Sequence, residues 1–323
     1  MRPWKPSLAS LLVLFSFNVA VAQEKPASMT VATASPGGVY AVYGEGLANL
    51  LSETLHIPVS TRQTQGPSQN LALVQSEKVD LGLTTTGPAL DAMQGHLDLN
   101  PGVKHQDIRA LFAMYPTPFQ MAALKSANIK RVEDLAGKRI GVGPKGGTGG
   151  VYWPRWFKAL GMSASFQYGG AGDQGNQLAD GRLDALLLAG GSPHPTYKEL
   201  EATKQIEVFG FDESRLNTIR KAFPDVVPFE IPGGTYKGQS GKVLTGAMWN
   251  IVVVNKSMSP DLAYNIVKAV FANRSRLMKT HSAAKDTLPE NILKNTAVPL
   301  HPGALRFYKE QGIQIPSAIQ PPA

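Results

Sequence analysis

The sequence repeats one local pattern at two places far apart in the chain: an apolar strand, a glycine-rich turn and a helix. The first copy contains Gly37-Gly-Val-Tyr40 and the second contains Gly149-Gly-Val-Tyr152. In each copy a short apolar run predicts a buried strand, and apolar residues at helical spacing follow the glycines. Glycines let the backbone approach a ligand closely, and the free N–H groups of a helix's first turn favour a carboxylate or phosphate. Two such turns predict two similar lobes that face one ligand.

These glycine-rich turns have other interpretations besides a ligand site. A glycine-rich turn also occurs where a helix packs closely on its strand, and this structural role stays open for either turn taken alone. Gly141-Val-Gly-Pro-Lys-Gly146 also matches G-x-G-x-x-G, the dinucleotide fingerprint. That fingerprint needs an acidic residue at the end of the next strand, about 20 residues on, and Phe166-Gln-Tyr-Gly-Gly170 offers none. We therefore expect no cofactor.

The first 22 residues have the features of an export signal. Arg2 and Lys5 precede an apolar stretch, and Ala20-Val-Ala22 is typical of a cleavage site. The apolar stretch is shorter than the roughly 20 residues that a spanning helix needs. Because the chain has no cysteine, it has neither a disulfide nor a lipid-modified thiol. Residues 1–22 are predicted to be a signal peptide, and the mature protein to be periplasmic, soluble and not lipid-anchored.

The charge distribution favours small partners over nucleic acid. The formal net charge is +8, and removal of the predicted signal peptide lowers it to +6. Lysine and arginine are scattered rather than clustered, which argues against nucleic acid. A mild positive excess suits small anions or an acidic surface, and it is equally typical of an ordinary solvated surface.

Beyond the signal, predicted strands and helices alternate. This alternation predicts an α/β fold with two lobes, each a mostly parallel sheet flanked by helices. Helices are predicted at 67–76 and 172–180. Val79-Asp-Leu-Gly-Leu83 and Leu183-Asp-Ala-Leu-Leu187 share one pattern, which also favours two similar lobes. The predicted strands lie near 29–34, 57–61, 80–84, 108–114, 119–124, 139–143, 164–168, 183–188 and 206–209.

The chain is expected to pass between the two lobes twice. Residues 109–125 and 243–255 both read as strands that pass between lobes, so lobe 1 is predicted to contain 23–117 plus 251–323. Lobe 2 is predicted to be the insert 118–250, with the ligand cleft between the lobes and hinge residues near Thr117 and Lys242. Residues 316–323 are rich in proline and are predicted to be loose.

Across the mature chain, five segments carry a resemblance to a known family. They are Ile231-Pro-Gly-Gly-Thr-Tyr-Lys-Gly-Gln239, Asp134-Leu-Ala-Gly-Lys-Arg139, Gly190-Gly-Ser-Pro-His-Pro195, Ala283-Ala-Lys-Asp286 and Pro299-Leu-His-Pro-Gly-Ala304. With these segments the chain resembles the TAXI-type solute-binding receptors that serve tripartite ATP-independent periplasmic (TRAP) transporters. The resemblance implies a two-lobed type II periplasmic binding protein. Such a receptor closes on a small organic acid, such as glutamate or a dicarboxylate, and delivers it to TRAP membrane permease subunits.

Two loops depart from the family pattern. Thr64-Gln-Gly-Pro-Ser-Gln-Asn70 replaces the common Thr-Gly-Gly-Ser-Val-Glu-Asn, and Thr85-Thr-Gly87 replaces the common Gln-Ser-Asp. Both loops are expected beside the ligand, so the ligand of better-known members does not carry over.

The expected ligand-binding residues follow from the turns and from the ends of the predicted strands. They are Ser35, Gly37, Gly38 and Tyr40 in the first turn, Gly66, Ser68 and Asn70 at the second helix start, Thr85 and Thr86 after the third strand, Lys145, Gly147, Thr148 and Gly149 in the opposing turn, Gly190, Gly191 and Ser192 in lobe 2, and Trp249 and Asn250 on the crossing strand. Tyr40 is alternatively a core residue, and Lys145 an exposed lysine. Ser68 and Asn70 are alternatively helix caps.

No enzyme chemistry is predicted from the motifs. The sequence contains no His-Glu-x-x-His, Cys-x-x-Cys or Gly-x-Ser-x-Gly, so no catalytic or metal-binding residue is expected. His194 and His301 stand beside prolines and are expected to be turn or surface residues. An exported enzyme, or a ligand sensor for a membrane kinase, stays open as an alternative because fold does not fix function.

Overall fold

The computed structural model describes residue 1 and residues 25–322. Apart from Met1, the predicted signal peptide lies outside the described residues. Within the described part of the chain, no helix has the length and apolar character needed to cross a bilayer.

Ten strands and ten α-helices make up the described chain. The strands are β1 (Met29–Ala32), β2 (Val59–Arg62), β3 (Leu81–Thr85), β4 (Ile108–Leu124), β5 (Arg139–Gly141), β6 (Ser165–Gln167), β7 (Ala185–Ala189), β8 (Ile206–Phe209), β9 (Val227–Ile231) and β10 (Val243–Asn255). The helices are α1 (Val39–Leu55), α2 (Pro67–Gln75), α3 (Thr86–Gln94), α4 (Thr148–Ala159), α5 (Ala171–Ala179), α6 (Pro195–Thr203), α7 (Glu213–Ala222), α8 (Pro260–Ala272), α9 (Arg274–Thr280) and α10 (Pro302–Glu310). Short 3₁₀ turns are η1 (Lys125–Ala127), η2 (Val132–Leu135), η3 (Ser282–Asp286), η4 (Pro289–Lys294) and η5 (Ser317–Ile319).

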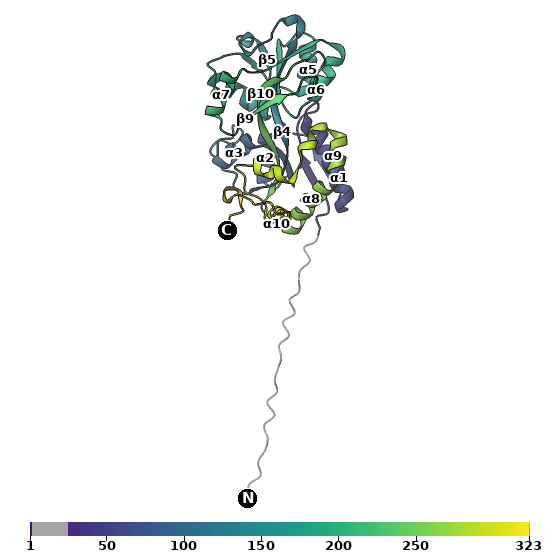
Figure 1. Ribbon diagram of the computed structural model, residues 1–323. Helices are drawn as coiled ribbons and strands as arrows, with labels where there is room; N and C mark the ends of the chain where they lie inside the picture. The colour runs from purple at the N-terminus through teal and green to yellow at the C-terminus, as the bar shows by residue number, and fades with distance from the viewer. Residues whose placement is uncertain (2–24, 323) are drawn as a thin grey trace.

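The strands form a mixed sheet in the order β2-β1-β3-β10-β4-β7-β5-β6, with β8 on β4 and β9 on β10. The first three strands are mutually parallel, as are β5, β6 and β7, whereas β4 and β10 run antiparallel to their neighbours. Figure 1 shows β4 and β10 along the length of the molecule, with α1, α8, α9 and α10 around its lower half and α5, α6 and α7 around its upper half. The α/β class is as predicted, and parallel pairing is confined to the two outer parts of the sheet.

The two long strands, β4 and β10, run through both the lower and the upper half of the sheet, and each pairs with the parallel strands of one half. In the lower half β10 pairs with β3, and in the upper half β4 pairs with β7 in the equivalent position. The stretches predicted at 108–114 and 119–124 are one continuous strand of 17 residues. The predicted strand at 243–255 is confirmed, whereas β9 was not predicted.

The apolar core divides into separate clusters along these strands. One cluster draws on residues of 29–115 and 251–319, and the other two draw on residues of 119–248. We call the described residues of 25–117 with 251–322 lobe 1 and residues 118–250 lobe 2, names that follow the predicted boundaries.

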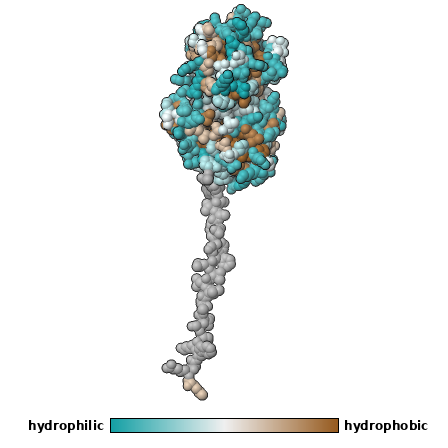
Figure 2. Space-filling view, turned by 60° about the vertical axis from the view of Figure 1, so that its left-hand side comes forward, coloured by the Kyte–Doolittle hydropathy of each residue, from teal (hydrophilic) through white to brown (hydrophobic). Residues whose placement is uncertain are grey.

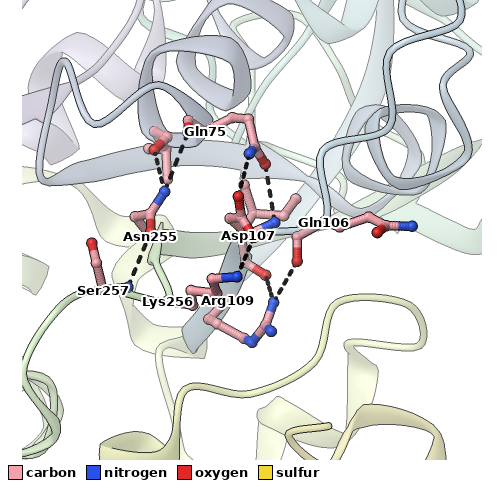
Figure 3. Close-up of polar contacts among 9 residues, drawn as sticks. Gln75, Gln106, Asp107, Arg109, Asn255, Lys256 and Ser257 are labelled. Carbon is pink, nitrogen blue, oxygen red and sulfur yellow. Dashed lines mark hydrogen bonds and ion pairs between the residues drawn. The ribbon is translucent and has the colours of Figure 1, made fainter.

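A polar network holds the C-terminal end of α2 (Figure 3). The Gln75 side chain donates to Asp107 Oδ2 at 2.8 Å and accepts the Asp107 backbone N–H at 3.0 Å. Asn255 Nδ2 donates to the Val74 carbonyl at 3.1 Å, and Lys256 pairs with Asp107 at 2.7 Å. Hydrogen bonds from Lys256 and Gln75 hold the pKa of Asp107 below its ordinary value. The network thus ties α2 to the start of β4 and the end of β10, and it fixes where the N-terminus of α2 points.

The C-terminal residues pack against lobe 1, so the predicted loose tail is wrong for the described part of it. The Ile319 side chain is buried, and the Ile319 backbone carbonyl accepts the Leu300 N–H at 2.8 Å.

Figure 2 shows a mainly hydrophilic face with hydrophobic residues gathered on its lower part.

Candidate functional site

A small, partly open cavity of about 60 Å³ lies between the lobes. Its walls come from both lobes. Lobe 1 contributes Ala34, Ser35, Gly38, Val39, Tyr40, Gln65, Gly66, Pro67 and Thr117, and lobe 2 contributes Val142, Gly143, Pro144, Gly147, Thr148, Gly149, Ala171, Leu188, Ala189, Gly190 and His194. A wider hollow of about 1060 Å³, open to solvent, shares Ser35, Gln65 and Pro144 with the cavity. The inner cavity therefore adjoins a broad outer chamber.

Four helices begin at the cavity wall: α1, α2, α4 and α5. None of them has a hydrogen bond from its N-terminal backbone to a capping side chain. Of the other six α-helices, α7, α8 and α10 are capped by the side chains of Asp212, Ser259 and His301, whereas α3, α6 and α9 also lack a side-chain cap. The first N–H groups of a helix have no acceptor within the helix, and its N-terminus is electropositive. The cavity is therefore lined by backbone donors suited to an anion.

Glycines form this part of the wall because the surrounding backbone leaves no room for a side chain at these positions. A Cβ on Gly147 would lie 3.1 Å from the Pro144 carbonyl oxygen, and one on Gly38 would lie 3.2 Å from that of Ser35. Gly66 has φ +106°, a backbone conformation that residues with a side chain rarely adopt. A Cβ added at Gly66 would lie 3.1 Å from Gly147 Cα. The lobes thus touch backbone to backbone.

Further contacts close the cleft. The Ser68 N–H donates to the Gly146 carbonyl at 3.1 Å, and Thr196 Oγ1 donates to the Gly37 carbonyl at 3.0 Å. On another side Asp91 Oδ2 accepts from Arg155 at 2.7 Å and from Tyr152 at 3.0 Å. Each bond joins lobe 1 to lobe 2, so the structure represents a closed arrangement.

Asn250 supports the cavity wall from behind. Its Oδ1 accepts from Tyr40 at 2.5 Å and from Thr117 at 2.8 Å, while its Nδ2 donates to the Tyr115 carbonyl at 2.6 Å. Burial raises the pKa of Tyr40, so its phenol stays protonated and donates. Asn250 on β10 therefore holds α1 and β4 in register at the bottom of the cleft.

The structure brings part of the predicted set to the cavity. The residues that line it are Ser35, Gly38, Tyr40, Gly66, Gly147, Thr148, Gly149 and Gly190. Gly37 and the exposed Lys145 line the outer chamber instead. The residues that contribute to neither wall are Ser68, Asn70, Thr85, Thr86, Gly191, Ser192, Trp249 and Asn250.

Asn70 lies behind the wall rather than in it. Its Nδ2 donates at 2.7 Å to the carbonyls of Thr33 and of Leu83, and its Oδ1 accepts from Thr64 at 2.6 Å. Because Gly66 is the N-cap of α2 and no side chain caps that helix, the alternative that Ser68 or Asn70 caps it is wrong. Asn70 instead ties the ends of β1 and β3 to α2.

His194 is buried in the cavity wall, whereas the sequence predicted a turn or surface residue. It lines the cavity and is 2% exposed, so it is not a surface residue. Burial lowers its pKa to about 3, with a smaller contribution from His281, so the imidazole is neutral at ordinary pH. Among the described residues its Nδ1 has no hydrogen-bond partner. It follows the carboxyl end of β7 in lobe 2, as Thr85 ends β3 in lobe 1, and that position was the available signal.

Sequence reasoning also missed the polar outer chamber. Besides Lys145 it is lined by neutral amides and two carboxylates, namely Gln63, Gln65, Gln69, Asn176, Asp173 and Glu199. In the described part of the chain, no three His, Asp or Glu side chains gather in a way that could hold a metal ion.

The mixed sheet and the two-lobed cleft define the periplasmic binding protein fold. The chain is similar to MatC from Rhodopseudomonas palustris with bound malate, with a TM-score of 0.58 at 13% identity over 88% of this chain and 96% of that one. It is also similar to R. palustris Rpa4515 with adipate, with a TM-score of 0.55 at 19% identity over 80% and 87% of the two chains. The periplasmic binding protein BugD gives 0.57 at 14% identity over 88% and 93%.

These identities are low, so the similarities concern the fold alone. The chain belongs to the NMT1-like family, whose model matches residues 31–312.

Proposed function

We propose that the protein is a periplasmic solute receptor that captures a small organic anion between its lobes. The observation that carries this proposal is the convergence of four uncapped helix N-termini on one cavity between the lobes. The fold supports it, because the structures that this chain resembles include proteins named with bound malate and adipate.

The chemistry of the wall favours a carboxylate held by backbone amides. The side chains at the cavity are neutral, and Lys145 stands in the outer chamber. A carboxylate accepts several N–H groups at once and interacts favourably with the positive ends of the helices. A neutral sugar would leave part of these donors without a strong acceptor, and a cationic amine would be repelled. The anion is therefore an amino acid such as glutamate, or a monocarboxylate or dicarboxylate.

The finer assignment rests on the resemblance of segments such as Ile231–Gln239 to TAXI-type receptors. In this proposal residues 1–22 direct export, the mature chain stays free in the periplasm, and TRAP permease subunits receive the ligand. Lobe 1 is 23–117 plus 251–323, and lobe 2 is 118–250. The protein acts without a cofactor and is not an enzyme.

A ligand panel tests the proposal. Thermal shift followed by calorimetry would cover amino acids, 2-oxo acids, dicarboxylates and the amides of each hit. We expect one organic acid to bind at micromolar concentration or below. A charge-assisted hydrogen bond contributes about 1.5–3 kcal/mol, so the matching amide should bind roughly 10- to 100-fold more weakly. Binding of only a neutral sugar or a cationic amine would contradict the proposal.

A further inference from the structure

One wall of the cavity is the segment 190–194, which follows β7. It contributes Gly190 and His194 to the wall. The segment is an irregular loop whose backbone joins β4 at one end, where the Gly190 N–H donates to the Pro118 carbonyl at 3.3 Å. The rest of its shape depends on contacts from behind. Those contacts come from Gln120 on β4 and from Tyr236 in the loop 231–239.

Tyr236 and Gln120 hold both ends of this segment. The Tyr236 hydroxyl accepts the His194 backbone N–H at 2.6 Å and donates to Gln120 Oε1. Gln120 Nε2 in turn donates to the Gly190 carbonyl at 2.8 Å. The Tyr236 and Gln120 side chains are 2% and 0% exposed. A buried donor or acceptor that loses its partner is costly, so this chain of bonds strongly favours one shape of the segment.

The loop 231–239 is itself fixed. The Gly234 N–H donates to the Gln239 carbonyl at 2.7 Å, and Gln239 Nε2 donates to the Pro232 carbonyl at 3.1 Å. The Lys237 N–H donates to Glu201 Oε2 at 2.6 Å. These bonds hold the loop 231–239 in one conformation and so fix the position of Tyr236. The physical role of this sequence segment is to hold Tyr236 in place.

The support acts within one lobe. His281 of lobe 1 also contacts the segment, because its Nε2 lies 3.1 Å from the Pro193 carbonyl. That contact crosses the cleft and is lost when the lobes separate. Tyr236 and Gln120 belong to the same lobe as the segment, so their bonds persist in an open state. A wall that is already shaped before the ligand arrives saves the cost of ordering it on binding.

We propose that Tyr236, acting through Gln120 and the segment 190–194, is a positioning residue for the ligand. The inference rests on the proposed function for the ligand, while the shape of the segment is measurable without one.

The test is the variant Tyr236→Phe, with Tyr197→Phe as the matched control. Tyr197 is equally buried, lies in the same lobe, and its ring centroid is 5.7 Å from that of Tyr236. Its hydroxyl bonds the Gln120 and Leu186 carbonyls and the Leu188 N–H, all on strands rather than on the segment. Both variants should lose thermal stability.

Of the two tyrosine variants, only Tyr236→Phe should loosen the segment 190–194 and speed its hydrogen exchange. Hydrogen exchange without ligand should become at least about 10-fold faster for the amides of 190–194 in this variant and stay unchanged in Tyr197→Phe. With the acid identified by calorimetry, Tyr236→Phe should bind roughly 10-fold more weakly, and Tyr197→Phe should bind as the wild type does. Gln120→Leu should behave as Tyr236→Phe does, and the double variant should lose less than the sum because the two residues share one network.

Equal exchange in the two tyrosine variants, or unchanged exchange in Tyr236→Phe, would overturn the inference. If the wild type binds no acid in the panel, the proposed function fails, and the exchange experiment still decides whether Tyr236 shapes the segment.

Discussion

The hydroxyls of Thr85 and Thr148 lie 2.9 Å apart and join the first turn of α3 in lobe 1 to that of α4 in lobe 2. Both side chains are buried, at 0% and 6% exposed. When the lobes separate, water can reach both hydroxyls, so this pair exists only in the closed state.

Replacing one member of this pair should weaken ligand binding. Thr85→Val leaves the Thr148 hydroxyl without a partner in the closed state, whereas the open state is unaffected. We expect binding to weaken roughly 5- to 30-fold, because an unpaired buried hydroxyl costs about 1–2 kcal/mol. Calorimetry measures this, and the unliganded melting temperature should change little if the free protein is open. The double variant Thr85→Val/Thr148→Val should recover part of the loss, and a double variant weaker than the single one would contradict this account.

Ligand should shift the protein from an open to a closed state. β4 and β10 pass between the lobes near Thr117 and Asn250, and we expect dihedral changes there to separate the lobes. The predicted hinge at Lys242 is wrong, because that residue precedes β10 inside lobe 2, where Val243 pairs with Ile231. Small-angle scattering should show a smaller radius of gyration under saturating ligand than without it. An identical radius in both conditions would remove the hinge.

A β-branched residue at a cavity glycine should abolish tight binding. In Gly147→Val the side chain would crowd the Pro144 carbonyl and stand where a ligand approaches the α4 N-terminus. We expect a loss of at least about 10-fold, since charge-assisted bonds from the first turn would be blocked. Gly38→Val should behave similarly.

Gly241→Val is the control for these variants. A Cβ at Gly241 would have no neighbour within 4 Å, and its φ is not positive. Calorimetry on folded variants should find normal binding for Gly241→Val. Normal binding by folded Gly147→Val would show that the turn does not contact the ligand.

Asp225 should make the protein less stable as the pH rises. Burial raises its pKa above the ordinary value of about 3.9, and the charge of Asp91 adds to the rise. Below the ordinary pKa the carboxyl is protonated in both states and has no effect. Above it the unfolded state loses its proton first, so the free energy of unfolding falls until the folded pKa is passed.

Asp225→Asn should therefore be more stable than the wild type at pH 7, and the difference should vanish near pH 3. Thermal melts across this range measure it. A variant equally destabilised at both pH values would indicate instead that the amide is poorly accommodated.

Local patterns in the sequence predicted the parts of this molecule that depend on neighbouring residues. The turn at Gly37-Gly38 stands out because glycine permits the geometry, and α2 begins at Pro67 as expected. The second turn ends earlier than predicted, because α4 begins at Thr148 and Gly149 and Gly150 lie inside that helix. The long strands were recognisable because apolar residues continue through Pro116 and Pro118.

Contacts between distant residues could not be predicted in this way. Asn250 and Tyr40 are 210 positions apart, and nothing in either segment indicates that one bonds the other. His194 has no local pattern that distinguishes a buried wall residue from a turn residue, so only its place after β7 was informative. Parallel pairing was overestimated for the same reason, because the insertion of β10 between β3 and β4 is a long-range event.

The exchange of β4 and β10 between the lobes also sets an order in time. Lobe 1 needs β10 beside β3, and Met248 of β10 lies in the core of lobe 2. The core of lobe 2 is incomplete until Met248 has been translated, and the core of lobe 1 until Ile319 has been. Pairing at such sequence separation is slow, so both lobes are expected to complete their sheets late in folding.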